Sequence, residues 1–334
     1  FPEAGGVSVS TVLERLPAII EKLRANAKAM DEKQFQQQAS GIHDLLEELD
    51  KAAENAHTVA LFPPLDPKDN VWLTPGDLMI AALDVQHPQQ MPVALFARFE
   101  QLAAKIGDPT GFETDLNDLH RDIVASATAR GEYRAVPVEL KYYRGQYMFK
   151  AQWLFVVAFL FVAISWLRPN GRWIHKIVPV AVLAPTILLC IGITYRCIIR
   201  LRPPVTTLYE TILFTVAVAV LASLVVELIN RRRVAISVGA ILGVVGMFLA
   251  NRYEAKEGMD TMPSMVAVLD TNFWLASHVT TIVIGYAAGL LAGALAHVYI
   301  LGKLVGFRKN DETFYNGYGR MVYGVICFSL LFST

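Results

Sequence analysis

The feature that most constrains this chain is a series of long apolar runs in its second half. They occur at residues 148–167, 174–195, 208–229, 234–250 and 273–302, and a further run begins near residue 321. A helix needs about 20 apolar residues to cross a bilayer, and hydrocarbon offers no partner for backbone polar groups outside a helix or a closed barrel. We therefore predict an all-α, polytopic helical membrane protein with about six spans, the last one cut by the end of the sequence.

The first 145 residues have a different character. Their apolar side chains recur at three- and four-residue spacing, which is typical of amphipathic helices. Prolines mark a connector over 58–74, and Thr74 followed by Pro75 has the form of a helix N-cap. No strand alternation of any length is present. The sequence predicts a helical extramembrane domain over 1–145 and a membrane domain over 146–334.

Charge divides the chain near the same place. Residues 1–147 contain 22 Asp and Glu against 14 Lys and Arg, a net charge of −8. Residues 148–334 contain 8 against 16, a net charge of +8. The basic residues of the second half fall between the apolar runs, so they indicate topology and form no continuous face for nucleic acid. We expect no nucleic-acid partner.

Lys and Arg are enriched in the cytoplasmic loops of membrane proteins. Three loops that alternate correctly along the chain are basic: 168–176, 230–233 and 303–320. If these are cytoplasmic, the acidic N-terminal domain and the 251–272 loop face outward. Arg196, Arg200 and Arg202 then lie on the outer side, against the rule. They are either noise in the rule or a site for an anionic group.

The run that begins at residue 273 carries the main candidate ligand. Trp274 lies where an interfacial aromatic belt is expected, and His278, four residues on, shares its helix face. A histidine inside a span is a functional candidate by default, and the alternative is an interface histidine with satisfied hydrogen bonds. His297 would lie about 28 Å from His278 along a helix, so the two cannot ligate one metal ion. A packing role is the simpler interpretation of His297, although a pair with His175 is geometrically allowed.

The same run carries glycines at four-residue intervals, namely Gly285, Gly289 and Gly293. A stripe of small side chains lets the backbone of a neighbouring helix approach closely. The sequence therefore predicts a tight helix–helix contact along this face.

The segment 202–210 opens the third run. Two prolines fix an extended approach, and Thr207 is a candidate N-cap. Glu210 falls in the first helical turn, where a carboxylate suits the helix dipole. Its simplest interpretation is an ion pair with Arg200 and Arg202.

Two of these segments resemble CcsA-type cytochrome c assembly proteins. Pro203–Phe214 begins Pro-Pro-Val-Thr-Thr-Leu-Tyr-Glu and is similar to the entry segment PPVTNLYE of that family. Met265–Val279 is similar to the segment that ends at the family's first external haem-ligand histidine, which corresponds to His278, and Gly285–Ala288 also fits. The resemblance covers the membrane half of the chain and leaves the N-terminal domain unassigned.

The resemblance implies haem handling in a bacterial inner membrane, with the N-terminal domain in the periplasm. Members of this family act with a ResB/CcsB partner, or fused to one, and present haem at the outer face to apocytochrome c, whose two cysteine thiols add across the haem vinyl groups. The implied cofactor is haem b, with His278 as an axial ligand of its iron, in a component of a membrane cytochrome c synthase. The family's WWD segment, a second external histidine and a further membrane histidine are expected after the run near residue 321, beyond this sequence.

Thioether formation needs iron in a defined axial environment, anchored propionates and accessible vinyl groups. The imidazole of His278 supplies the first, with Trp274 beside it. Arg196, Arg200 and Arg202 are candidates for the second, through charge-assisted hydrogen bonds. The cofactor carries the reactive carbons, and the protein mainly orients them.

Two other functions remain open. A b-type cytochrome subunit would hold haem between histidines on facing spans, and only His175 with His297 offers that here. A haem-independent transporter would show internal repeats and matching broken spans; Pro185 and Gly192 interrupt the second run, without a matching half. The acidic N-terminal domain is either a docking module for a basic cytochrome or a spacer that packs on the ResB-like partner.

Overall fold

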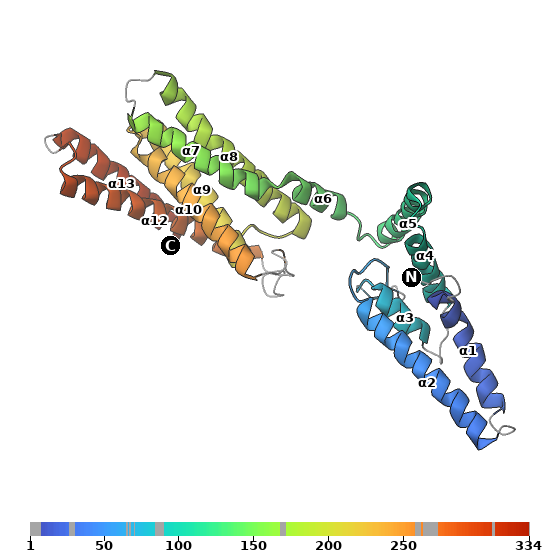
Figure 1. The fold of residues 1–334 in the computed structure, drawn as a ribbon. Coiled ribbons are helices and arrows are strands. Elements are labelled where there is room, and N and C mark those ends of the chain that lie inside the picture. The colour runs from blue at the N-terminus through green and yellow to red at the C-terminus, as the bar shows by residue number, and fades with distance from the viewer. Residues whose placement is uncertain are drawn as a thin grey trace. The chain divides into compact units, whose positions relative to one another are not determined.

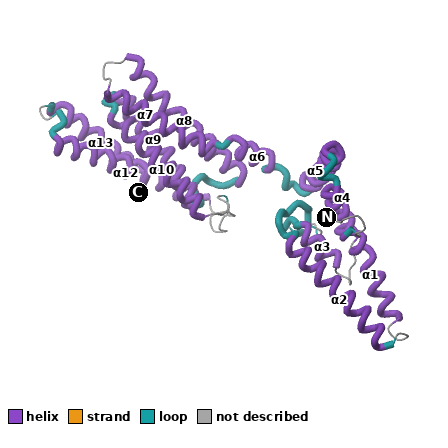
Figure 2. The backbone as a smooth tube through the Cα atoms, viewed as in Figure 1, coloured by secondary structure: helices purple, strands orange, loops and turns teal. Residues whose placement is uncertain are grey.

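A computed structural model describes residues 8–26, 31–64, 66, 68–69, 71–83, 90–167, 172–257, 262, 273–308 and 311–333. Within these residues the chain is built of α-helices and turns, with one isolated antiparallel bridge between Phe62 and Leu73 and no β-strand (Figure 2). The all-α prediction is confirmed. The chain divides into two compact units, Phe1–Arg134 and Ala135–Thr334, a little before the boundary drawn from the sequence.

The first unit is a set of amphipathic helices around its own core (Figure 1). The helices are α1 (Val9–Asn26), α2 (Glu32–Asn55), α3 (Pro75–Leu83), α4 (Gln90–Ala104) and α5 (Pro109–Ala129). Leu13 and Leu16 of α1 meet Leu49 of α2, Met79 of α3 and Phe96 of α4 in the buried cluster. This packing explains the apolar spacing in the sequence, because each helix buries one stripe.

The predicted N-cap at Thr74 is confirmed. Its hydroxyl accepts a hydrogen bond from the backbone N–H of Asp77 at 3.1 Å, and a carboxylate oxygen of Asp77 accepts the backbone N–H of Thr74 at 2.7 Å. His57 Nδ1 lies 2.9 Å from the same hydroxyl. These bonds hold the start of α3 against the end of α2.

Removing the Asp77 carboxylate is expected to loosen α3 in a pH-dependent way. The hydrogen bond from the Thr74 backbone is the main cause that lowers the pKa of Asp77 below 3.8. A depressed folded pKa contributes stability that is present above the unfolded pKa and lost as pH falls through the folded pKa. Asp77→Asn should therefore reduce the hydrogen-exchange protection of Pro75–Leu83 about fivefold at pH 7, for a cap worth ~1 kcal/mol. Parent and variant should converge near pH 2, and equal protection at pH 7 would contradict the capping role.

The second unit contains the membrane spans. Its helices are α6 (Val136–Gly145), α7 (Tyr147–Leu167), α8 (Arg172–Arg200), α9 (Leu208–Asn230), α10 (Val234–Glu257), α12 (Phe273–Val305) and α13 (Glu312–Ser333). Five helical stretches among the described residues are long and apolar enough to cross a membrane: Val136–Leu167, Lys176–Arg200, Leu208–Asn230, Val234–Lys256 and Phe273–Val305. The protein is therefore a multi-pass membrane protein. The predicted sixth run forms α13, which packs along α12 but is not among the five.

From α7 onward, successive helices of this unit run in opposite directions, so its turns gather at two ends (Figure 1). At one end, called here the Arg231 end, lie the turns at 231–233 and 306–308. At the other, called the His278 end, lie residues 201–207 and the start of α12. Helix α7 packs on α8, α9 on α10, and α12 on α13.

Glycines allow two of these contacts to be close. On α12, a Cβ atom on Gly285 would lie 2.8 Å from the backbone nitrogen of Ser333, and one on Gly289 would lie 3.0 Å from Ser329 Oγ. Gly293 has no described neighbour within 4 Å of its ideal Cβ position. The predicted tight contact is thus confirmed at Gly285 and Gly289 and wrong at Gly293, which is exposed although α13 packs on Leu291, Ala292 and Leu295 beside it. On α10, Gly239 meets the side chain of Ser223 in the same manner.

Gly285→Leu is expected to destabilise the membrane unit, whereas Gly293→Leu should not. The first adds a side chain where the α13 backbone already stands, and overpacking of this kind costs about 1–3 kcal/mol. The second adds the same side chain to the same helix face in open space. The measurement is the temperature at which the detergent-solubilised protein loses its monodisperse peak. Equal midpoints for the two variants would show that α13 does not pack on this stripe.

Candidate functional site

The turn between α8 and α9 is shaped by local sequence. Helix α8 ends at Arg200, and Leu201 takes a left-handed conformation, with φ 50°, that reverses the chain. Pro203 and Pro204 follow, and because proline disrupts the interior of a helix, the chain does not resume a helix directly after the turn. Helix α9 then begins behind Thr207, whose side chain accepts the backbone N–H of Glu210 at 3.2 Å. The predicted N-cap is confirmed, and it places Glu210 against α8.

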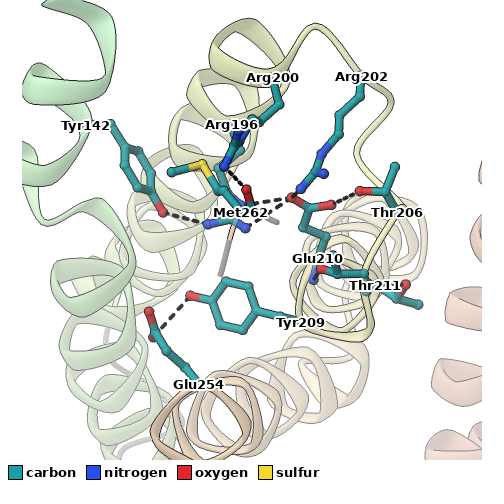
Figure 3. A network of polar contacts seen from close by, with 11 residues as sticks. Tyr142, Arg196, Arg200, Arg202, Thr206, Tyr209, Glu210, Thr211, Glu254 and Met262 are labelled. Carbon is teal, nitrogen blue, oxygen red and sulfur yellow. Dashed lines mark hydrogen bonds and ion pairs between the residues drawn. The ribbon is translucent and has the colours of Figure 1, made fainter. Parts of the chain in front are cut away.

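Glu210 forms a buried ion cluster with two arginines (Figure 3). Its Oε1 accepts Arg202 Nη2 at 2.8 Å and Arg196 Nη2 at 3.1 Å, while its Oε2 accepts the hydroxyl of Thr206. The side chains of Arg196 and Arg202 are 3% exposed, and that of Glu210 is 5% exposed. One carboxylate between two guanidinium groups leaves a net charge of +1 in this cluster.

Other helices contribute to the same network. Arg196 Nη1 donates to the hydroxyl of Tyr142 on α6 at 3.4 Å, and its guanidinium lies 5.0 Å from the centre of the Tyr209 ring. The Tyr209 hydroxyl donates in turn to Glu254 of α10 at 3.4 Å. The wider network around the ion cluster therefore joins α6, α8, α9 and α10, and Glu254 adds a second carboxylate to it (Figure 3).

Arg200 has a different environment from its two neighbours. It is exposed, and its Nη2 donates to the backbone carbonyl of Met262. Met262 is fully buried in a small cluster with Tyr142 and Ile199. Arg200 thus ties the segment before α12 to the end of α8.

The ion pairing left open by the sequence is present, with one change of partner. Glu210 pairs with Arg202 as expected, but its second partner is Arg196, while Arg200 binds Met262. Sequence reasoning missed Tyr142 and Glu254 as members of the network. Tyr142 lies 54 residues before Arg196, and no spacing rule links them.

The two aromatic candidates lie on the first turns of α12. Trp274 is 80% exposed, and His278, one turn later, is also exposed. No hydrogen bond joins the ring of His278 to any described residue, whereas His297 Nδ1 lies 2.7 Å from the carbonyl of Gly293. The start of α12, which carries Trp274 and His278, lies at the same end of the bundle as the turn between α8 and α9 (Figure 1), and no described contact joins these two residues to the arginines.

Several expectations fall on parts of the chain outside the described residues. The segment 265–272 is one of them. The side chain of His175 is another, so the pair of His175 with His297 remains a prediction.

The side chains at this end are an exposed imidazole, an exposed indole and the guanidinium groups of the ion cluster. The described residues contain no group of three or more His, Cys, Asp and Glu side chains placed to hold a metal. An exposed imidazole one turn from an exposed indole offers a single axial ligand beside a flat apolar surface, and the guanidinium groups nearby suit carboxylates.

No protein-family model matches this chain, and no curated protein matches its sequence.

Proposed function

We propose that this protein handles haem b at the periplasmic face of a bacterial inner membrane and presents it to apocytochrome c for covalent attachment. The observation that carries the proposal is the placement of His278. It is an exposed imidazole on the first turns of a span, one turn from the exposed Trp274. The resemblance of the two segments around Glu210 and His278 to CcsA-type proteins supports the same conclusion.

His278 is proposed to hold the iron from one axial side. Its ring makes no hydrogen bond to the described residues, so a ring nitrogen is available to a ligand outside the bundle. Trp274 lies on the same helix face and would cover part of the macrocycle. The haem supplies the vinyl carbons to which the cysteine thiols of apocytochrome c add.

The arginines are proposed to provide the electrostatic part of the site. Arg200 is the exposed one of the three and can reach a propionate at the membrane edge. Arg196 and Arg202 are buried, and their charges and that of Glu210 sum to +1, in a network that Glu254 also joins through Tyr209. They would act on the haem through their electric field and by shaping the protein around it, because their described hydrogen bonds are to protein groups.

The partners follow from the same proposal. A ResB/CcsB-like protein, separate or fused, would complete the complex, and apocytochrome c would accept the haem. The acidic first unit would face the periplasm, where it either docks a basic cytochrome or packs on the ResB-like partner. Apocytochrome binding that persists after deletion of residues 1–134 would rule out docking by this unit.

The experiment that tests the proposal is a visible spectrum of the purified full-length protein in detergent, oxidised and reduced. A b-type haem signal is expected in the preparation. A preparation without haem, after expression with sufficient haem supply, would favour a transporter or a scaffold. A stable low-spin haem that is not transferred to apocytochrome c in the presence of the ResB-like partner would favour a cytochrome subunit.

A further inference from the structure

A groove lies between α9 and α13, and Ile284 of α12 also lines it. Its volume is about 600 Å³. Most of its lining is apolar, including Val218, Leu221, Val225, Ile229, Ile284 and Phe328. Asn230 and Arg320 are the polar residues among those that line it.

The groove has the length of one bilayer leaflet. Along α9 it extends from Val218 to Asn230, which is about 18 Å at the rise of an α-helix. Half of a hydrocarbon core is about 15 Å. Ile284 lies about 16 Å from the start of α12, near the middle of that span. The groove therefore runs from the membrane midplane to the Arg231 end.

A cationic side chain lies where the groove meets the Arg231 end of the bundle. Arg320 is exposed, and no ion pair or hydrogen bond joins its guanidinium to another described residue. Its neighbours at the same end are engaged: Arg232 donates to the carbonyl of Phe314 at 2.6 Å, and Arg233 donates to that of Ser165 at 3.0 Å. Arg320 is thus a guanidinium at headgroup level that no described residue of the bundle binds.

We propose that this groove binds an anionic phospholipid of the leaflet at the Arg231 end. One acyl chain lies along the apolar wall, and the phosphate accepts hydrogen bonds from Arg320. Basic residues between spans at headgroup level recognise anionic lipids in this manner. The inference concerns a different end and face of the bundle from His278, and it does not depend on haem.

The shape and charge of the groove favour a lipid over another helix. The groove is about one leaflet long and ends at an exposed guanidinium, which matches an acyl chain that ends in an anionic headgroup. Val225 and Ile229 on its wall are exposed.

Native mass spectrometry of the delipidated full-length protein tests the proposal. The protein is titrated with phosphatidylglycerol, which is anionic, and with phosphatidylcholine, which is zwitterionic. The parent should bind phosphatidylglycerol about fivefold more tightly, the effect expected of one arginine near an anionic surface. Arg320→Gln should abolish that preference. Lys176→Gln should keep it, because it removes an exposed cation that lies on α8 at the same end of the bundle but outside the groove.

A second variant separates the apolar part from the charge. Val225 is 56% exposed, so Val225→Trp should fold and fill the groove, lowering the binding of both lipids about tenfold. Unchanged phosphatidylglycerol preference in Arg320→Gln would overturn the headgroup assignment. Unchanged lipid binding in Val225→Trp would overturn the proposal. If the parent forms a dimer and that variant also loses it, the groove is instead a contact with a second copy of the chain.

Discussion

His278→Ala is expected to abolish the low-spin b-type spectrum of the full-length protein or to convert it to a high-spin one. The physical reason is that an axial imidazole sets the ligand field of haem iron, and alanine leaves that coordination position to water or to nothing. The measurement is the visible spectrum of oxidised and reduced protein, together with the haem content per protein chain. Added imidazole should restore the low-spin spectrum, because it can occupy the space that the side chain vacates.

His297→Ala is the matched control for this experiment. Both histidines are exposed on α12, and they lie about 28 Å apart along it. His297 Nδ1 already contacts the Gly293 carbonyl, so its loss should leave the haem spectrum unchanged. If the two variants and the parent share one spectrum, His278 is not the ligand, and a cytochrome subunit with ligands elsewhere becomes the better interpretation.

The sequence predicted the apolar part of each span but not the polar ends of the helices. The apolar run 234–250 was correctly placed in a helix, yet α10 continues to Glu257 through Arg252 and Lys256. Hydropathy reports the depth at which a residue is stable, and residues such as Ala, Lys and Glu extend a helix into water at little cost. The same reason explains why α8 reaches Arg200, beyond its apolar run. Existence and type of the helices were therefore predictable, and their polar ends were not.

The candidate site shows a different limit. The cap at Thr207 was predictable, because an N-cap depends on residues three apart in the chain. The partner of Glu210 was not, because it depends on how the turn at Leu201 lays α9 against α8 and so brings Arg196 into reach. The prediction of a close contact at Gly293 was wrong for the same reason, because a small side chain permits a close contact but does not specify where the neighbouring helix runs.

Glu210→Ala is expected to be among the most destabilising single substitutions in the membrane unit. It would leave Arg196 and Arg202 buried without the carboxylate that both contact, and breaking a buried ion pair from one side costs about 3–5 kcal/mol. For a unit of this size, that corresponds to a fall of roughly 6–20 °C in the unfolding midpoint. The midpoint can be measured in detergent as the temperature at which the monodisperse fraction is lost.

Glu254→Gln provides the control for a carboxylate of the same network. Glu254 is exposed and accepts one 3.4 Å hydrogen bond from Tyr209, so its change should shift the midpoint by no more than a few degrees. If Glu210→Ala and Glu254→Gln have equal midpoints, the buried ion cluster does not stabilise the fold.

A triple variant separates the structural role of the cluster from its proposed role toward haem. Replacing Arg196 and Arg202 by methionine and Glu210 by leucine removes all three charges together, and such replacements of buried ion clusters are often neutral or stabilising. The triple variant should therefore recover most of the midpoint that Glu210→Ala loses. If it folds and keeps the haem content and spectrum of the parent, the two buried arginines serve the fold, and Arg200 is the arginine left to meet a propionate. If it folds and loses haem, the net positive charge of the cluster is part of the binding site, because stability no longer accounts for the loss.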